Sequence, residues 1–283
     1  QLTIAIIRNN NQKKNGLIFQ TAMKFTENFI KSLPFKLTNS QTVVWKEILE
    51  DLKSSNQMVR LLQGDVGSGK TIVALLAVLQ AFKSSFQAAI MVPTSLLAQQ
   101  HFLNIQNLFK NLNINIVILT SKDKGKIRLE KLEKIKNGQA NLVIGTHALI
   151  QDDVTFNSMG LVIIDEQHRF GVFQRIAFTN KGKKPNILVM SATPIPRTLA
   201  LAAYGDMDES RITEKPIGRL PIKTASLSIE KEERLINRLQ NKLKDNEKAY
   251  WVCPLIEESE ELDLKAATDR YENLKKIFDK KVL

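Results

Sequence analysis

Eight consecutive residues in the first third of the chain combine three glycines with a lysine and a threonine. They fit the pattern G-x-x-x-x-G-K-[ST], between a short apolar run and a stretch of helical periodicity. Glycines let the backbone curl so that several N–H groups point at one anion, and the lysine adds a positive charge. We therefore expect a phosphate-binding loop, in which Lys70 reaches the β and γ phosphates of ATP and Thr71 ligates Mg²⁺. The residues are Gly64, Asp65, Val66, Gly67, Ser68, Gly69, Lys70 and Thr71.

Two carboxylates end an apolar run further along the chain. Residues 161–164 are apolar, and Asp165 and Glu166 follow them directly. A strand of this kind places both carboxylates at the carboxyl edge of a sheet, beside the phosphate loop. Asp165 would hold Mg²⁺ through water, and Glu166 would polarise the water that attacks the γ-phosphate. By itself such a strand is ordinary, but together with the loop it predicts an ATP hydrolase with Lys70, Asp165 and Glu166 as its catalytic residues.

Short apolar runs alternate with helical stretches on both sides of these motifs, and an amphipathic helix over 42–52 precedes them. Such alternation predicts a parallel sheet covered by helices on both faces, a doubly wound α/β fold. The expected strands are 59–62, 88–92, 114–119, 142–144, 161–164 and 187–190, and the expected helices between them are 71–82, 96–109 and 126–136.

Two prolines and a glycine between residues 215 and 221 interrupt this pattern and indicate a linker. We expect residues 1–34 to be a connector, 35–214 to be the nucleotide-binding domain, and 215–283 to be a linker with the start of a second domain. That second part holds too few elements to close a sheet. Its expected elements are a strand over 224–228, a charged helix over 231–244, an apolar run over 249–256 and a helix over 263–278.

The composition favours an anionic partner, because Lys and Arg number 41 against 29 Asp and Glu, a net charge of +12. Nucleic acid is the first candidate; the alternative is that lysine is simply a common surface residue here. Cys253 is the only cysteine, so an intramolecular disulfide is excluded, and it forms no zinc site with the three histidines. No apolar run approaches a membrane span of about 18 to 20 residues. We expect a cytoplasmic, monomeric protein.

Five short motifs occur in the order that superfamily 2 helicases show. Within that superfamily, residues 64–71, 165–172 and 190–199 resemble the RecG family of bacterial branched-DNA translocases, and residues 251–258 and 262–267 extend the resemblance. The alternative, the transcription-repair factor Mfd, typically has Glu at the position of Gln167 and lacks the segment around Trp251. The five motifs are residues 37–41, 93–98, 145–147, 165–168 and 191–193.

The resemblance implies a RecA-like fold and a set of roles for individual residues. Gln41, with Phe35 and Leu37, would contact the adenine. Gln167, His168, Ser191 and Thr193 would sit by the γ-phosphate and relay its presence to the DNA-contacting surface. The residues that would touch the DNA backbone are Thr94, Thr120 and Thr146. The family usually has Thr-Gly-Ser where this chain has Thr120-Ser121-Lys122.

The resemblance also implies parts that these 283 residues do not match. They are an N-terminal wedge domain that engages the fork junction and an arginine in the rest of the second RecA-like domain. Gln1 in place of Met favours a truncated chain, although a processed end would look the same. We expect ATP-driven translocation on branched DNA, with binding of ATP stronger than hydrolysis in the fragment. The alternatives are a nucleotide-switched module that binds DNA without turnover and a small-molecule kinase, which Ser191-Ala192-Thr193 disfavours.

Among the histidines, only His168 has a motif that suggests a role. His101 and His147 are each expected to be packed or surface residues. Phe170, Phe173 and Trp251 fit base stacking by type, but their positions at strand ends and at helical spacing favour packing.

Overall fold

The computed structural model describes residues 16–165, 184–193, 207–216, 222–244, 247–252 and 270–278. The chain divides into two compact units, residues 1–219 and 220–283. No helix in the described ranges is long and apolar enough to cross a membrane. Glu166, Gln167 and His168 lie outside these ranges, as do Phe170, Phe173 and Cys253.

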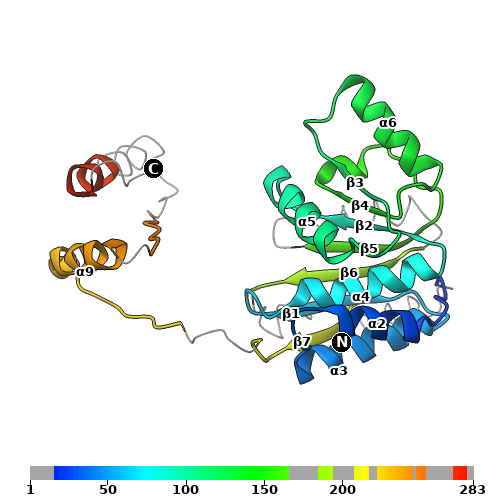
Figure 1. The fold of residues 1–283 in the computed structure, drawn as a ribbon, viewed down its shortest axis with the longest axis horizontal. Coiled ribbons are helices and arrows are strands. Elements are labelled where there is room, and N and C mark those ends of the chain that lie inside the picture. The colour runs from blue at the N-terminus through cyan, green and yellow to red at the C-terminus, as the bar shows by residue number, and fades with distance from the viewer. Residues whose placement is uncertain are drawn as a thin grey trace, which may run out of the picture. The chain divides into compact units, whose positions relative to one another are not determined.

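The larger unit is built on a sheet that has seven strands among the described residues, in the order β3-β4-β2-β5-β6-β1-β7. They run from the upper edge to the lower edge of this unit in Figure 1. Every described strand pair is parallel. The predicted doubly wound α/β fold is confirmed. The strands are β1 (Val59–Gly64), β2 (Gln87–Met91), β3 (Ile116–Leu119), β4 (Leu142–Gly145), β5 (Met159–Asp165), β6 (Asn186–Ser191) and β7 (Asp208–Ile212).

The alternation of side chains along the strands divides the core into two clusters, one on each face. In β1, Leu62 belongs to the first cluster and Leu61 to the second; in β5, Ile163 and Ile164 divide in the same way. This is the period-two arrangement of a sheet that is buried on both sides. Near-continuous apolar runs were therefore the right signal for six of the strands.

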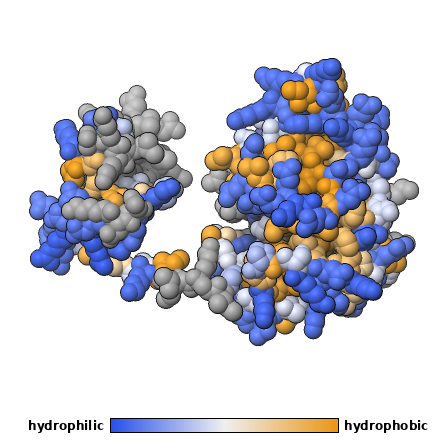
Figure 2. Space-filling view, viewed as in Figure 1, coloured by the Kyte–Doolittle hydropathy of each residue, from blue (hydrophilic) through white to orange (hydrophobic). Residues whose placement is uncertain are grey.

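Helices cover both clusters. Helices α2 (Met23–Ser32), α3 (Asn39–Lys53), α4 (Lys70–Lys83) and α5 (Ser95–Leu108) contribute to the first cluster. Helix α6 (Gly125–Lys136) and the 3-10 turn η1 (His147–Ile150) contribute to the second. Figure 2 shows hydrophilic residues over much of the visible rim of this unit, with apolar residues toward its middle.

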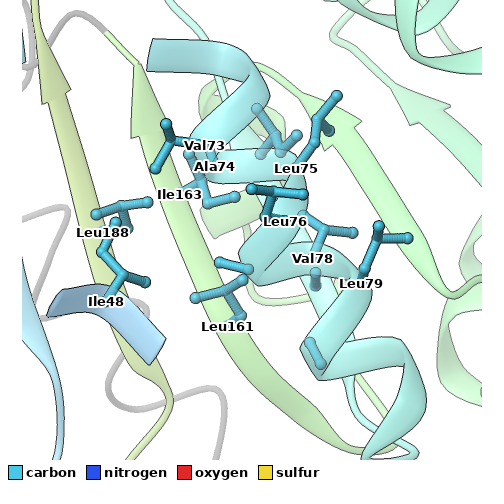
Figure 3. Packing of buried hydrophobic residues seen from close by; sticks show 14 of the residues in the cluster. Ile48, Val73, Ala74, Leu75, Leu76, Val78, Leu79, Leu161, Ile163 and Leu188 are labelled. Atoms are coloured by element: carbon cyan, nitrogen blue, oxygen red, sulfur yellow. The ribbon is translucent and has the colours of Figure 1, made fainter. Parts of the chain in front are cut away.

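Helix α4 lies in the middle of the first cluster, and every residue from Ile72 to Ala81 is buried. A helix that is apolar all round must be covered on all sides. In Figure 3 its side chains lie against Leu161 and Ile163 of β5, Leu188 of β6 and Ile48 of α3. The phosphate-loop sequence therefore leads directly into the most enclosed helix that the structure describes.

Residues 16–33, which the sequence assigned to a connector, pack on α4 and its neighbours. The ring of Phe19 stacks on that of Phe86 with centroids 5.2 Å apart. The side chain of Gln80 in α4 accepts a hydrogen bond from Ala22 N–H at 3.0 Å and donates one to Thr26 Oγ1 at 2.6 Å. This segment is thus part of the same hydrophobic core as the sheet.

The smaller unit is described in three pieces, 222–244, 247–252 and 270–278. The predicted charged helix is present as α9 (Glu232–Lys244), preceded by the turn η3 (Ile229–Lys231), and residues 270–278 are helical. Arg270 forms an ion pair with Glu232, and its guanidinium lies 5.2 Å from the centroid of the half-buried Trp251 ring. The strand expected over 224–228 is wrong: these residues have no regular structure, because a strand needs a hydrogen-bonded neighbour and the described residues there supply none.

Replacing Gln80 with Met tests whether residues 16–33 help to hold the larger unit together. The substitution keeps the volume but removes the acceptor of Ala22 N–H and the donor to Thr26. We expect it to lower the free energy of unfolding by about 1–3 kcal/mol, measured by urea denaturation. The matched control is Gln99→Met on the exposed face of α5, which should change little. Equal effects of the two substitutions would contradict this account.

Candidate functional site

The loop at residues 64–71 links the end of β1 to the start of α4. Lys70 Nζ donates hydrogen bonds to Gly64 O at 2.6 Å and to Asp65 O at 3.1 Å. Ser68 N–H donates to Asp65 O at 3.1 Å. The chain therefore curls back on itself, and the Lys70 ammonium lies against the first residues of the loop.

Two glycines in this loop have backbone conformations that other residues rarely adopt. The φ angle is 72° at Gly67 and 86° at Gly69. A Cβ atom on Gly69 would also collide with Nε2 of Gln41. Gly69 is therefore required twice, once for its φ angle and once because the neighbouring side chain comes so close.

Gln41 connects the start of α3 to the loop. Its side chain is 2 % exposed, and Nε2 donates to Ser68 O at 2.7 Å. Oε1 accepts from Thr38 N–H at 2.9 Å, and Thr38 Oγ1 accepts from Gln41 N–H at 3.1 Å, which together form a capping box. Just before this helix, Phe35 is exposed and Leu37 is half-buried.

The segment after β7 returns to the same place. Lys215 Nζ lies 2.8 Å from Asp65 Oδ2, and Ser40 N–H donates to Glu214 Oε2 at 3.1 Å. The hydrogen bond from Lys215 holds the pKa of Asp65 below its ordinary value, with Val66 N–H acting in the same direction. The start of the predicted linker is thus in direct contact with the loop.

The carboxyl ends of three adjacent strands bring the other motifs to the loop. Asp165 ends β5 and pairs in register with Met190, and Ser191 ends β6 and pairs with Gln63. Asp165 therefore lies two strands from the loop, at the same edge of the sheet. Ser191 Oγ lies 3.1 Å from Thr193 Oγ1 and donates to Thr193 O at 3.1 Å, so these two predicted coupling residues contact each other.

A residue to which the sequence assigned no role lies beside Asp165. His101 of α5 places Nε2 3.1 Å from Asp165 Oδ2, with 14 % and 17 % of the two side chains exposed. Its neighbours at helical spacing, Ala98 and Ile105, are fully buried, so His101 is on the inward face of α5. That spacing could have suggested an inward position but not this partner, which belongs to a strand far away in sequence.

The three threonines predicted to contact DNA also form a row. Thr94, Thr120 and Thr146 follow β2, β3 and β4, which are neighbours in the sheet. Thr94 is exposed and accepts a hydrogen bond from Leu97 N–H at 3.2 Å. The other two are 7 % and 3 % exposed, and Thr146 Oγ1 has no hydrogen-bond partner among the described residues.

Asp123 organises the turn that follows β3. It accepts hydrogen bonds from Thr120 N–H at 2.8 Å and from Lys131 Nζ at 2.5 Å. Burial raises the pKa of this carboxyl, but the hydrogen bonds from Lys131 and Thr120 outweigh it and hold the pKa below its ordinary value. The exposed lysines of the turn and the first turn of α6 are Lys122, Lys124 and Lys126.

A glycine-containing loop between a buried strand and a buried helix, with an aspartate at the same sheet edge, defines a P-loop nucleotide-binding domain. The model of the DEAD/DEAH box helicase family matches residues 38–202, more than half of the chain. The chain therefore belongs to the DEAD/DEAH box helicases. Within them, the predicted resemblance to RecG is confirmed by the relatives that follow.

The ATP-dependent DNA helicase RecG of Bacillus subtilis is 50 % identical over 250 residues, which cover 88 % of this chain and 37 % of the relative. RecG of Aquifex aeolicus is 48 % identical over 286 residues, 100 % of this chain and 36 % of the relative. A solved structure of RecG bound to a three-way DNA junction matches with a TM-score of 0.83 and 42 % identity, over 98 % of this chain and 36 % of that one. The chain thus spans between a third and two fifths of the length of these relatives.

Gly69→Ala is expected to abolish ATP binding, because the added Cβ collides with Gln41 and the φ angle of 86° is strained for alanine. Gly125→Ala is the matched control: its φ is 55°, but no atom lies within 4 Å of the added Cβ. The control should destabilise the fold by about 1 kcal/mol through backbone strain alone and leave ATP affinity unchanged. Isothermal titration with ATP measures both variants, and an unaltered affinity in Gly69→Ala would contradict the assignment of the loop.

Proposed function

We propose that these residues form part of an ATP-dependent translocase that acts on branched double-stranded DNA, such as stalled replication forks and Holliday junctions, in recombination and repair. The observation that carries the proposal is the shared sheet edge: the phosphate loop after β1, Asp165 at the end of β5 and the three threonines after β2, β3 and β4 all lie along it. The residues proposed to act on ATP and the threonines proposed to contact the DNA backbone are thus carried by one sheet. Similarity to RecG relatives at 48 to 50 % identity supports the same function.

The loop fits the phosphates of ATP. Ser68 Oγ is buried without a partner among the described residues, and Gly67 and Gly69 have the left-handed backbone conformation that occurs in anion-binding nests. Lys70 supplies the cation for the β and γ phosphates, and Phe35, Leu37 and Gln41 would contact the adenine. Contact by Gln41 requires its side chain to turn outward, because it is 2 % exposed and both of its amide atoms are hydrogen-bonded to the chain. The phosphates would be enclosed by residues 64–71.

Magnesium fits the oxygen donors at this edge. Mg²⁺ takes oxygen ligands in proteins. Thr71 offers a hydroxyl oxygen, and Asp165 offers a carboxylate oxygen. The bound ion would neutralise charge that develops on the phosphate oxygens. Glu166 orients the attacking water and accepts its proton, and Gln167, His168, Ser191 and Thr193 pass the state of the γ-phosphate to the DNA-contacting row.

The DNA-contacting surface combines this row with positive charge. Thr94 is already exposed, at the N-terminus of α5, where backbone N–H groups favour a phosphate. Lys122, Lys124 and Lys126 are exposed in the turn that follows Thr120 and at the start of α6. Lys122 adds its charge where the family usually has Ser. Contact at Thr120 and Thr146 requires their turns to open, because both hydroxyls are buried. Such contacts bind the backbone without reading the base sequence. We place the protein in the bacterial cytoplasm, with DNA as its partner.

ATP hydrolysis measured with and without duplex DNA tests the proposal, with binding of Mg·ATP measured in parallel. We expect DNA to accelerate hydrolysis. Glu166→Gln should keep ATP affinity and lose hydrolysis, because the amide keeps the shape but cannot accept the proton. Lys70→Ala should lose ATP binding while the fold remains, because Lys70 supplies charge and is not a core residue.

Three outcomes would contradict the proposal or one of the residue roles within it. Hydrolysis that DNA does not affect would favour a nucleotide-switched binding module. Loss of ATP binding in Glu166→Gln would mean that the roles of Asp165 and Glu166 are exchanged. Unchanged ATP affinity in Lys70→Ala would remove the phosphate-loop assignment itself.

A further inference from the structure

The contact between His101 and Asp165 joins two elements that the phosphate-loop motif does not connect. Asp165 ends β5, and His101 lies on α5, two helical turns after Thr94. The Nε2 to Oδ2 distance of 3.1 Å is that of a hydrogen bond, and both side chains are largely shielded from solvent. A long-range polar contact of this kind fixes the direction of a carboxylate that would otherwise rotate.

The functional groups of His101 and Asp165 determine which side chain donates the hydrogen bond. A carboxylate oxygen can only accept a hydrogen bond, so the contact with a metal-binding carboxylate requires the tautomer of His101 that carries Nε2–H. One oxygen of Asp165, Oδ2, is thereby engaged, whereas no described residue forms a hydrogen bond with the other, Oδ1. Carboxylates that bind metals in proteins are held by such hydrogen bonds, which orient them and tune the affinity of the site.

The position of His101 on α5 is rigid. Ala98 and Ile105, three residues before and four residues after it, are both fully buried in the first hydrophobic cluster. The helix backbone that carries His101 is therefore anchored to the sheet on both sides of this residue. At the other end of the same helical face, Thr94 caps the N-terminus of α5.

We propose that His101 is a positioning residue for Asp165: it donates a hydrogen bond to Oδ2 and so presents the carboxylate to the Mg²⁺ that accompanies ATP. This rests on the function proposed above. The same helix begins at the exposed Thr94, so a shift of α5 caused by DNA would reach the carboxylate through His101.

Substitution of His101 separates this role from simple packing. His101→Leu keeps the volume but removes the donor, whereas His101→Gln keeps an N–H donor at a similar reach. The affinity of a fluorescent N-methylanthraniloyl derivative of ATP is measured in excess Mg²⁺ and in EDTA, and the ratio of the two affinities reports the contribution of the metal. Gln100→Leu, on the exposed face one residue before, is the control.

We expect His101→Leu to lower this ratio about tenfold, the lower end of what loss of such a partner costs a metal site. The affinity in EDTA and the melting temperature should stay as in the wild type, and His101→Gln should restore most of the ratio. An unchanged ratio in His101→Leu, equal losses with and without Mg²⁺, or a failure of His101→Gln to restore the ratio would each overturn the inference. Each of these three results would leave the proposed function intact. A wild-type chain that binds no nucleotide would contradict both the proposed function and the role of His101.

Discussion

The hydrogen bond from Gln41 Nε2 to Ser68 O is the contact on which the phosphate loop depends. It can form only because Gly69 has no Cβ atom, and Gln41 is held in place by its capping box with Thr38. Helix α3, which carries Gln41, packs Ile48 against the buried helix α4. The loop is thus held from two directions, by α4 that follows it and by the first turn of α3.

The sheet supplies the rest of the geometry. Parallel strands all end at one edge, so residues from six separate segments reach a common surface without a dedicated scaffold. Along that edge the residues proposed to act on the nucleotide lie at the ends of β1, β5 and β6, and the threonines proposed to contact DNA follow β2, β4 and β3. Because His101 and Thr94 share α5, this helix is a physical link between the two groups. Lys215 makes a second link, from the loop to the segment that leads into the smaller unit.

The sequence predicted most of this edge because its signals are local. The glycine pattern and the apolar run before Asp165 each depend on neighbours in sequence. Strand β7 was not predicted, since Asp208–Ile212 has no apolar run; among the described strands it pairs with β1 alone, at the edge of the sheet. The strand expected over 224–228 failed because strand formation needs a partner. The integration of residues 16–33 and the approach of His101 to Asp165 depend on tertiary packing, which no local pattern contains.

Hydrogen–deuterium exchange of the backbone amides of residues 65–71 tests the central claim most directly, because these N–H groups are the proposed phosphate donors. Mg·ATP should slow their exchange strongly, while Mg·AMP, which lacks the β and γ phosphates, should slow it little. Amides near Phe35 should be protected by both nucleotides through the adenine. The account would be contradicted if Mg·ATP did not slow exchange at residues 65–71, or if Mg·ATP and Mg·AMP slowed it equally.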